Sequence, residues 1–134
     1  MSQIDISKKA LLLHKKLQGK LRVVPTMPIK NRDDLSLVYT PGVAAVSQHI
    51  ASKPEEARLY TGKGRMIAVI SDCSAVLGLG NIGPYGALPV MERKCALFKT
   101  FANVDAVPIV LDTQEVDAVV RLELSRSQVY GSIT

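Results

Sequence analysis

Two side chains in this 134-residue sequence stand where they could take part in chemistry. Tyr39 stands where a Pro-Gly pair ends a predicted short helix, so a fixed backbone can direct its phenol into a cleft. Lys94 lies among apolar neighbours on a helix that we expect to be buried, where desolvation would lower the pKa of its amine. Each residue also has an ordinary interpretation, because Tyr39 can cover the rim of a core and Lys94 can extend its charged end into solvent.

A glycine motif, Gly78-Leu-Gly-Asn-Ile-Gly83, follows a predicted strand and precedes a predicted helix. In that setting G-x-G-x-x-G can bind the pyrophosphate of a dinucleotide. Three features count against this use: the motif begins seven residues after Ser71, Pro84 follows it, and the acidic candidate Asp105 precedes the next predicted strand instead of ending it. We therefore favour a structural glycine turn and assign no cofactor-binding residue.

Cysteine and histidine give no support to a metal site. Cys73 and Cys95 lie 22 residues apart in a sequence without secretory features, so they are predicted to be ordinary half-buried thiols. His14 and His49 lie on predicted helices without companion ligands. We expect both histidines on solvated faces.

The composition is that of a globular domain, with 47% hydrophobic and 22% charged residues. At 134 residues the chain fits one domain or a part of one. Its apolar runs are much shorter than the roughly 18 residues of a membrane span, and its first residues lack a signal-peptide pattern. A cytoplasmic protein without membrane attachment is predicted.

The net charge of +5 is unevenly distributed, because residues 1–65 carry 12 Lys and Arg against 5 Asp and Glu. A basic half of this kind can attract nucleic acid, an anionic substrate or an acidic partner. No aromatic residues interleave with the lysines, and the lysines of the first predicted helix fall on its polar side. These are Lys8, Lys9, Lys15 and Lys16. A solvated face is therefore favoured over nucleic-acid binding.

Two kinds of element must position these residues. Residues 1–65 show apolar side chains at helical spacing, divided by caps, prolines and glycines. The helices predicted there are one around Ile6–Leu17, a short one around Leu35–Val38, one containing Val43–Ile50, and one that starts with a capping box at Ser52–Glu55 and ends near Gly62 and Gly64.

After Gly64 the pattern changes to strands and longer helices. Met66–Ser71 and Val107–Leu111 are short, apolar and rich in β-branched residues, which is typical of parallel strands covered on both faces. Ala87–Phe101 is long enough for a crossover helix, and Asp112–Glu115 starts another. The predicted fold class is α/β, with a helical N-terminal section followed by strand-helix-strand-helix units of a small, mainly parallel sheet.

Five segments, in order along the chain, closely resemble the N-terminal domain of malic enzymes, particularly the compact bacterial-type form. They are Val23–Pro25, Lys30–Ala44, Ala68–Asp72, Ala75–Gly83 and Ala87–Glu92. The resemblance runs from about Ala10 to Thr134. It implies that residues 1–134 form a single, incomplete substrate-side domain, and that the C-terminal NAD(P)-binding domain is absent from this sequence.

The resemblance also implies a function, the oxidation of L-malate with NAD or NADP and its decarboxylation to pyruvate and CO₂, with Mg²⁺ or Mn²⁺ polarising the substrate. Tyr39 is similar to the family's general acid, which protonates C3 of enolpyruvate, and Lys94 to the general base that takes the C2 hydroxyl proton. A lysine pKa of about 10.4 must be lowered for this role, whereas a tyrosine at about 10 stays protonated. The partners implied are L-malate, pyruvate and a second copy in a homo-oligomer, expected to be a dimer.

Several positions depart from the family's pattern. Malic enzymes usually have Gly where Cys73 stands, Asp where Asn81 stands and Gly where Arg93 stands, and residues 121–128 lack the family's helical pattern. The metal and nucleotide ligands are implied to lie beyond residue 134, so we expect the chain alone to be inactive. The alternative is a non-catalytic remnant or oligomerisation module of the same family.

Overall fold

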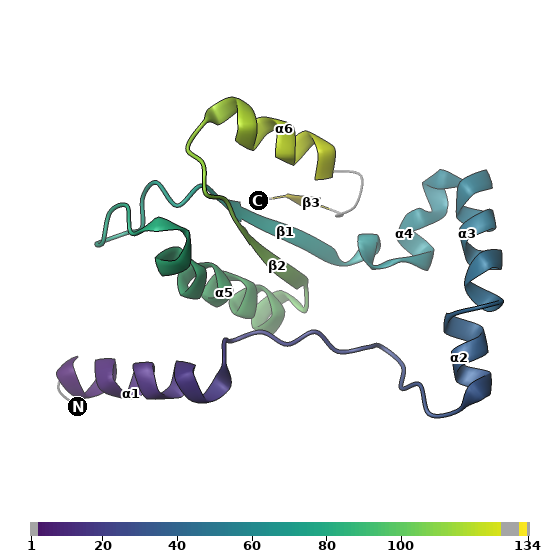
Figure 1. The fold of residues 1–134 in the computed structure, drawn as a ribbon, viewed down its shortest axis with the longest axis horizontal. Coiled ribbons are helices and arrows are strands. Elements are labelled where there is room, and N and C mark those ends of the chain that lie inside the picture. Colours follow the sequence, from purple (N-terminus) through teal and green to yellow (C-terminus); the bar gives the residue numbers. More distant parts are fainter. Residues whose placement is uncertain (1–2, 127–131, 134) are drawn as a thin grey trace.

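The structure is a computed structural model that describes residues 3–126 and 132–133 (Figure 1). Its elements follow the predicted order of a helical section and then alternating strands and helices. They are α1 (Gln3–Leu17), α2 (Arg32–Val38), α3 (Gly42–Ser52), the 3₁₀ turn η1 (Pro54–Glu56), α4 (Ala57–Tyr60), the 3₁₀ turn η2 (Gly62–Gly64), β1 (Met66–Ser71), α5 (Gly83–Ala102), β2 (Asp105–Val110), α6 (Val116–Arg126) and β3 (Ser132–Ile133).

The strands form a parallel sheet in the order β2-β1-β3. Met66 lies opposite Asp105, and Ser71 lies opposite Val110. The predicted α/β class with a small parallel sheet is confirmed. β2 begins two residues earlier than predicted, because the Asp105 amide donates to the Arg65 carbonyl at 3.2 Å and so continues the ladder. The short strand β3 was not predicted.

The core lies between the sheet and α5. Val69, Met91 and Cys95 form its centre, with 3% or less of each residue exposed. Ala68 is also fully buried, and because neighbouring strand residues point to opposite faces, both faces of β1 are covered at its middle. Figure 1 shows α5 and α6 on opposite sides of β1 and β2.

The helix α5 is longer than predicted, since it begins at Gly83 and includes two prolines. Pro84 stands in the first turn, where the amide that proline lacks would have no helical partner. Pro89 lies inside the helix, and its carbonyl accepts a hydrogen bond from Lys20 Nζ at 2.9 Å. The helix ends at Asn103, which adopts the left-handed conformation with φ 52°.

The helices α2 and α3 form an arm that stands to one side of the sheet (Figure 1). The described residues of α2, α3 and α4 are all at least partly exposed. Asn31 caps the N-terminus of α2, because its Oδ1 accepts from the Asp34 amide at 2.8 Å. Towards α2 the chain runs in extended conformation from the end of α1, where the Lys20 amide donates to Glu92 Oε2 at 3.0 Å.

The predicted capping box at Ser52–Glu55 is wrong. Helix α3 continues to Ser52, whose hydroxyl donates to the His49 carbonyl at 2.8 Å instead of capping the next helix. Lys53 is the residue before η1, and its side chain makes no capping hydrogen bond. Ser52 is therefore used to end one helix and is not free to begin another.

Within the described ranges, no helix is both long and apolar enough to cross a lipid bilayer. The stretch at residues 121–128, whose sequence departs from the family's helical pattern, is helical as far as Arg126, as the end of α6. Residues 127 and 128 lie outside the described part of the chain.

Candidate active site

Lys94 lies on the exposed side of α5, directly before a buried residue. The buried stripe of this helix is Ala87, Met91 and Cys95, which recur every four residues. Lys94 lies at the edge of that stripe, about 100° around the helix from Cys95 and about 60° from Met91, and its side chain is exposed. The exposure of Lys94 fits its ordinary interpretation, in which the charged end extends into solvent, because α5 is covered by the sheet on one side only.

A pocket of about 420 Å³ lies between β1 and this side of α5. Its lining is apolar apart from the amine of Lys94, and consists of Val69, Ile70, Lys94, Leu97, Phe98, Phe101 and Ala102. The sequence analysis missed the aromatic part of this lining. Lys94, Leu97, Phe98 and Phe101 are spaced i, i+3, i+4 and i+7, which was the available signal for a second stripe beside the buried one.

This pocket can supply only a part of an acid–base site. An amine can bind a carboxylate or exchange a proton, but the apolar walls offer nothing to a second carboxylate or a hydroxyl group. In the described residues, no group of three or more His, Cys, Asp or Glu is placed to hold a metal ion. A divalent metal therefore does not fit the described part of the chain, and we derive no step through it.

Tyr39 is the residue that ends α2, and 64% of it is exposed. Its amide donates to the Leu35 carbonyl at 2.8 Å, and its carbonyl accepts from the Val43 amide at 2.7 Å. After the cis bond between Thr40 and Pro41, α3 begins at Gly42. The backbone around Tyr39 is thus held from both helices, as the Pro-Gly pair predicted.

Gly42 explains how the two helices approach so closely at Tyr39. A Cβ atom on Gly42 would lie 2.3 Å from the Leu37 carbonyl oxygen and 2.7 Å from that of Ser36. Both neighbours are backbone atoms of α2, which cannot rotate away as a side chain can. Glycine is therefore needed at this position to keep α2 and α3 packed against each other.

The structure does not bring Tyr39 and Lys94 together within one chain. Tyr39 belongs to the arm, where α2 packs against α3, and the described residues show no comparable packing of α2 on α5. Figure 1, which looks down the shortest axis of the molecule, shows α2 and the middle of α5 well apart. The two predicted catalytic residues lie on separate surfaces.

The glycine motif forms a tight turn. The Val76 amide donates to the Gly80 carbonyl at 2.8 Å, and the Gly80 amide donates back to the Val76 carbonyl at 2.9 Å. Gly78, Gly80 and Gly83 all have positive φ, from 70° to 80°, and a Cβ on any of them would meet open space. The backbone conformation, rather than a close neighbour, therefore calls for glycine here.

The three departures from the family's pattern have different structural settings. Cys73 is 98% buried and has φ 61°, a conformation that glycine adopts more easily, which explains the family's usual residue. Asn81 Oδ1 accepts from the Gly83 amide at 3.1 Å, as an aspartate oxygen also can. Arg93 is exposed and is not part of the pocket lining, so its bulk does not enter the pocket.

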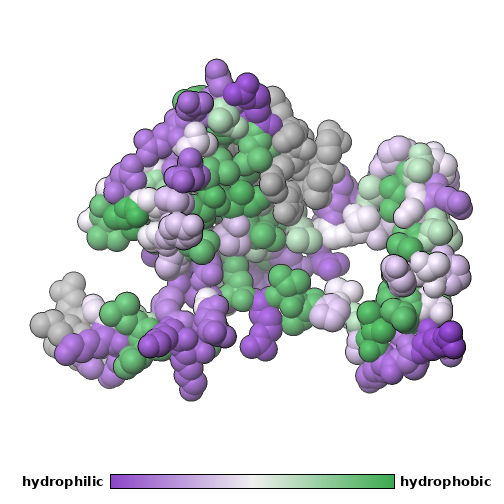
Figure 2. All heavy atoms as spheres, viewed as in Figure 1, coloured by the Kyte–Doolittle hydropathy of each residue, from purple (hydrophilic) through white to green (hydrophobic). Residues whose placement is uncertain are grey.

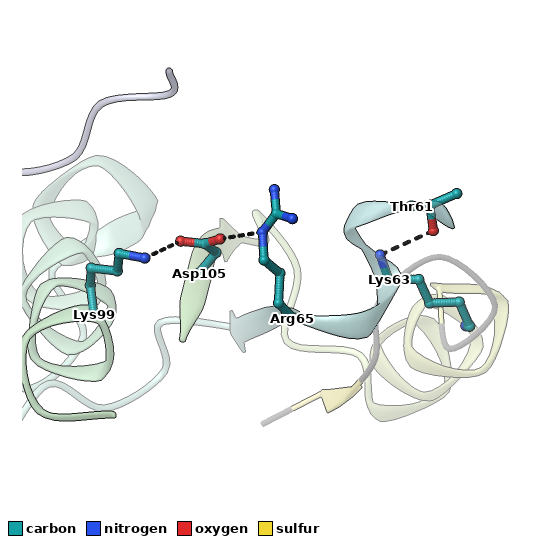
Figure 3. Close-up of polar contacts among 5 residues, drawn as sticks. All are labelled: Thr61, Lys63, Arg65, Lys99 and Asp105. Carbon is teal, nitrogen blue, oxygen red and sulfur yellow. Dashed lines mark hydrogen bonds and ion pairs between the residues drawn. The ribbon is translucent and has the colours of Figure 1, made fainter. Parts of the chain in front are cut away.

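Asp105, the acidic candidate for a ribose ligand, is held by two cations (Figure 3). Lys99 Nζ lies 2.8 Å from Oδ1, and Arg65 Nε lies 2.8 Å from Oδ2. The hydrogen bond from Lys99, followed in size by the one from Arg65, lowers the pKa of Asp105 below its ordinary value. The carboxylate thus ties the start of β2 to α5 and to the residue before β1. Near Arg65, the Lys63 amide donates to Thr61 Oγ1 at 3.2 Å.

His49 was predicted to lie on a solvated face, but it is partly buried against α4. Its Nε2 lies 2.7 Å from Glu56 Oε2, and its ring meets Tyr60 edge-on with centroids 4.9 Å apart. The hydrogen bond from His49 is the main cause that lowers the pKa of Glu56. His14 is also partly buried, with Nδ1 2.7 Å from the Ala10 carbonyl oxygen.

Both cysteines are free thiols and are more deeply buried than predicted, with 2% of Cys73 and none of Cys95 exposed. Burial raises the pKa of Cys95, which keeps its thiol protonated and unreactive. They are core residues rather than reactive groups.

Comparisons with known proteins show which family this chain belongs to. Residues 18–124 match the family model described as the malic enzyme N-terminal domain. The chain belongs to the malic enzyme family. It is 47% identical over 130 residues to an NAD-dependent malic enzyme of Geobacillus stearothermophilus. The matched residues make up 97% of this chain and 27% of that relative. An NADP-dependent malic enzyme of Halomonas elongata is 48% identical over 112 residues, covering 81% of this chain and 26% of the relative.

Solved malic enzymes share the fold as well as the sequence. The crystal structure of a malic enzyme from Pyrococcus horikoshii matches with a TM-score of 0.91 and 44% identity, covering 96% of this chain and 30% of the other. The chain therefore spans about a quarter to a third of the length of these malic enzymes. Its family is established, and the activity of the whole relatives is a matter of proposal.

Proposed function

We propose that this chain supplies the substrate-side domain of a malic enzyme, which converts L-malate to pyruvate and CO₂ with NAD or NADP and a divalent metal. The observation that supports this proposal is the 47% identity to a malic enzyme over 97% of the chain. Residues 1–134 form, in this proposal, one incomplete domain of a cytoplasmic enzyme that works as a homo-oligomer. The nicotinamide and the metal are assigned no residues in this chain.

The proposed chemistry uses two proton transfers. Lys94, as a neutral amine, takes the proton of the C2 hydroxyl group, and Tyr39 later gives its phenolic proton to C3 of enolpyruvate. A lysine can act as a base near neutral pH only when desolvation or a neighbouring positive charge lowers its pKa. The exposed position of Lys94 in this chain thus implies that the pocket is closed by further protein in the working enzyme.

The test of this function measures malate-dependent NADH and NADPH formation in the presence of Mn²⁺. We expect no turnover by the 134 residues alone, and turnover when they are fused at residue 134 to the C-terminal part of the Geobacillus stearothermophilus relative. No turnover by this fused chain, when it is folded, would contradict the proposal. It would favour the alternative, a non-catalytic oligomerisation module of the family.

Replacing Lys94 in the fused chain tests its role as the base. Lys94→Ala should lower kcat by a factor of about 10² to 10⁴, the usual contribution of one general acid–base group. Arg93→Ala is the matched control, because Arg93 is the adjacent exposed cation outside the pocket lining. If both variants keep the parent rate, Lys94 is not the base.

A further inference from the structure

We propose that His49 is a positioning residue for the reaction, because its hydrogen bond to Glu56 sets the angle at which the arm presents Tyr39. This inference rests on the proposed function, in which Tyr39 donates a proton to C3 of enolpyruvate. A general acid must come within about 3 Å of the atom that it protonates, directly or through one water. The orientation of the arm therefore decides whether Tyr39 can act.

Tyr39 moves together with α3. Its amide donates to the Leu35 carbonyl at 2.8 Å, and its carbonyl accepts from the Val43 amide at 2.7 Å, so its backbone is held from both helices of the arm. Gly42 lets α2 approach α3 so closely that a Cβ atom there would lie 2.3 Å from the Leu37 carbonyl oxygen. The position of Tyr39 relative to the sheet is thus set by whatever fixes α3.

The arm is joined to the sheet through the turn that follows α3. That turn consists of η1, α4 and η2 and leads directly into β1, whereas the described residues show no comparable packing of α2 or α3 on the sheet or on α5. On the other side, residues 21–31 lead into α2, are all exposed and belong to no helix or strand. Figure 2 shows the arm standing beside the central body, with hydrophobic and hydrophilic side chains on its surface. The angle of the arm is therefore set at the joint between α3 and the turn.

Burial along α3 is concentrated at this joint. Residues 43–48 are all exposed, whereas His49 and Ile50 are partly buried, as are Glu56 and Ala57 in the turn. The Nε2 atom of His49 lies 2.7 Å from Oε2 of Glu56. His49 is thus both a partly buried residue of α3 and the one that bonds to the turn.

The bond between His49 and Glu56 has a defined direction. This hydrogen bond is the main cause that lowers the pKa of Glu56, so at neutral pH the group is a carboxylate, which can only accept. The hydrogen therefore lies on His49 Nε2. The other carboxylate oxygen, Oε1, lies 3.3 Å from Nζ of Lys53, the residue between α3 and η1. The His49 ring also meets the Tyr60 ring edge-on with centroids 4.9 Å apart, so the joint includes α4.

A small change at this joint is enlarged at Tyr39. His49 and Gly42 stand seven residues apart on α3, which is about 10 Å at about 1.5 Å per residue. A tilt of about 10° at the joint would thus move the far end of α3 by about 2 Å. A misplacement of about 1 Å can cost an enzyme a factor of about 100 in rate. Loss of the His49 hydrogen bond should therefore slow the reaction, although His49 lies at the other end of the helix from Tyr39.

The test compares two substitutions of His49 in the fused chain. His49→Gln keeps an amide N–H that can donate to Glu56, whereas His49→Phe keeps a ring beside Tyr60 and loses the donor. We expect His49→Phe to lower kcat about 10- to 100-fold with little change in KM for malate, and His49→Gln to keep most of the parent rate. Gln48→Ala is the control, since Gln48 is the exposed neighbour on α3, and it should keep the parent rate.

A second background shows whether His49 acts through Tyr39. In a fused chain that already carries Tyr39→Phe, the substitution His49→Phe should cause little further loss of kcat, because the group that it positions is gone. A substitution that only destabilises the fold would lower the rate by the same factor in both backgrounds. An equal loss in both backgrounds, no loss in the parent, or a His49→Gln chain as slow as His49→Phe would overturn the proposal.

Distances between spin labels test the orientation of the arm without turnover. In the 134-residue chain, labels are attached to Leu37→Cys on α2 and Tyr85→Cys on α5, at residues that are 70% and 90% exposed. Dilution with unlabelled chain restricts the signal to distances within one chain, and the unsubstituted chain controls for labelling of Cys73 and Cys95. We expect His49→Phe to broaden or shift the distance distribution and His49→Gln to leave it unchanged.

An unchanged distance distribution in His49→Phe would also overturn the proposal, because the arm would keep its angle without the hydrogen bond. Failure of the proposed function is a separate result. It appears as no turnover by the unsubstituted fused chain, while the label distances still respond to His49→Phe. Circular dichroism of each variant shows that it is folded before it is measured.

Discussion

Asp105 shows at the residue scale how an acidic group can be used for structure instead of ligand binding. Its two carboxylate oxygens accept from Lys99 on α5 and from Arg65 before β1, each at 2.8 Å. The carboxylate side chain is 34% exposed, so water screens the two ion pairs and their contribution to stability is modest. Asp105, which in the sequence was a candidate cofactor ligand, instead links the start of β2 to α5 and to the residue before β1.

The ion pairs of Asp105 predict a pH dependence of stability. The lowered pKa of this group means that the folded state favours the carboxylate, so its stabilising effect is fully present above the unfolded pKa of about 3.9 and is lost as the pH falls through the lower folded pKa. Asp105→Asn should reduce the free energy of unfolding by about 1 kcal/mol or less at pH 7. Urea unfolding at pH 7 and at successively lower pH measures the difference between parent and variant.

This difference should shrink below pH of about 3.9 and approach zero once the parent's Asp105 is protonated. Asp112→Asn, a change of an exposed carboxylate after β2, is the control and should have little effect at either pH. A difference for Asp105→Asn that stays constant or grows as the pH falls would show that the ion pairs do not stabilise the fold.

At the scale of elements, the hydrophobic pattern and the turn residues were sufficient to predict most helices and both longer strands. The apolar, β-branched run at Met66–Ser71 corresponds to β1 at both ends, because burial on both faces leaves little freedom in where a strand lies. The start of α5 was missed because Pro84 looks like a break in sequence, yet it fits a first helical turn. β3 was missed because its two residues carry too little pattern.

The site was harder to predict than the fold. Tyr39 could be singled out from its Pro-Gly neighbour, and the close contact at Gly42 explains that signal. The local pattern could not decide between a buried and an exposed Lys94, since the apolar residues beside it form two stripes and only one of them meets the sheet. Distances between elements far apart in sequence, such as α2 and α5, follow from packing that no local pattern records.

Gly42 gives a direct test of how the arm is fixed. Gly42→Ala should lower the free energy of unfolding by about 1–3 kcal/mol, because its Cβ would overlap backbone carbonyl oxygens of α2. Gly86→Ala is the matched control, since a Cβ there meets only the side chain of Ile82 at 3.1 Å, inside a helix that alanine favours. Urea unfolding monitored by circular dichroism compares the two. Equal effects of the two substitutions would show that the approach of α2 to α3 does not depend on Gly42.

At the scale of the whole molecule, the core is small and the uncovered apolar surface is large. The buried apolar centre lies between β1, β2 and α5, whereas α1, α2 and α3 expose most of their apolar side chains. Helices of this length gain most of their stability from packing an apolar face rather than from helix propensity. The exposed apolar side chains of the arm are therefore a surface that the proposed homo-oligomer would cover.

Stability linked to association depends on protein concentration, and this gives a prediction for the whole molecule. The proposed homo-oligomer predicts that the thermal midpoint of the chain rises with protein concentration, because only folded chains associate. Leu37→Asp should remove much of this rise, since it places a charge on the exposed apolar surface of α2, at a residue that is 70% exposed. At low concentration its midpoint should equal that of the parent. Leu77→Asp, at a fully exposed residue of the glycine turn, should keep the parent's concentration dependence. Calorimetry over a wide concentration range measures all three chains, and a midpoint of the parent that does not change with concentration would contradict the proposed association through the arm.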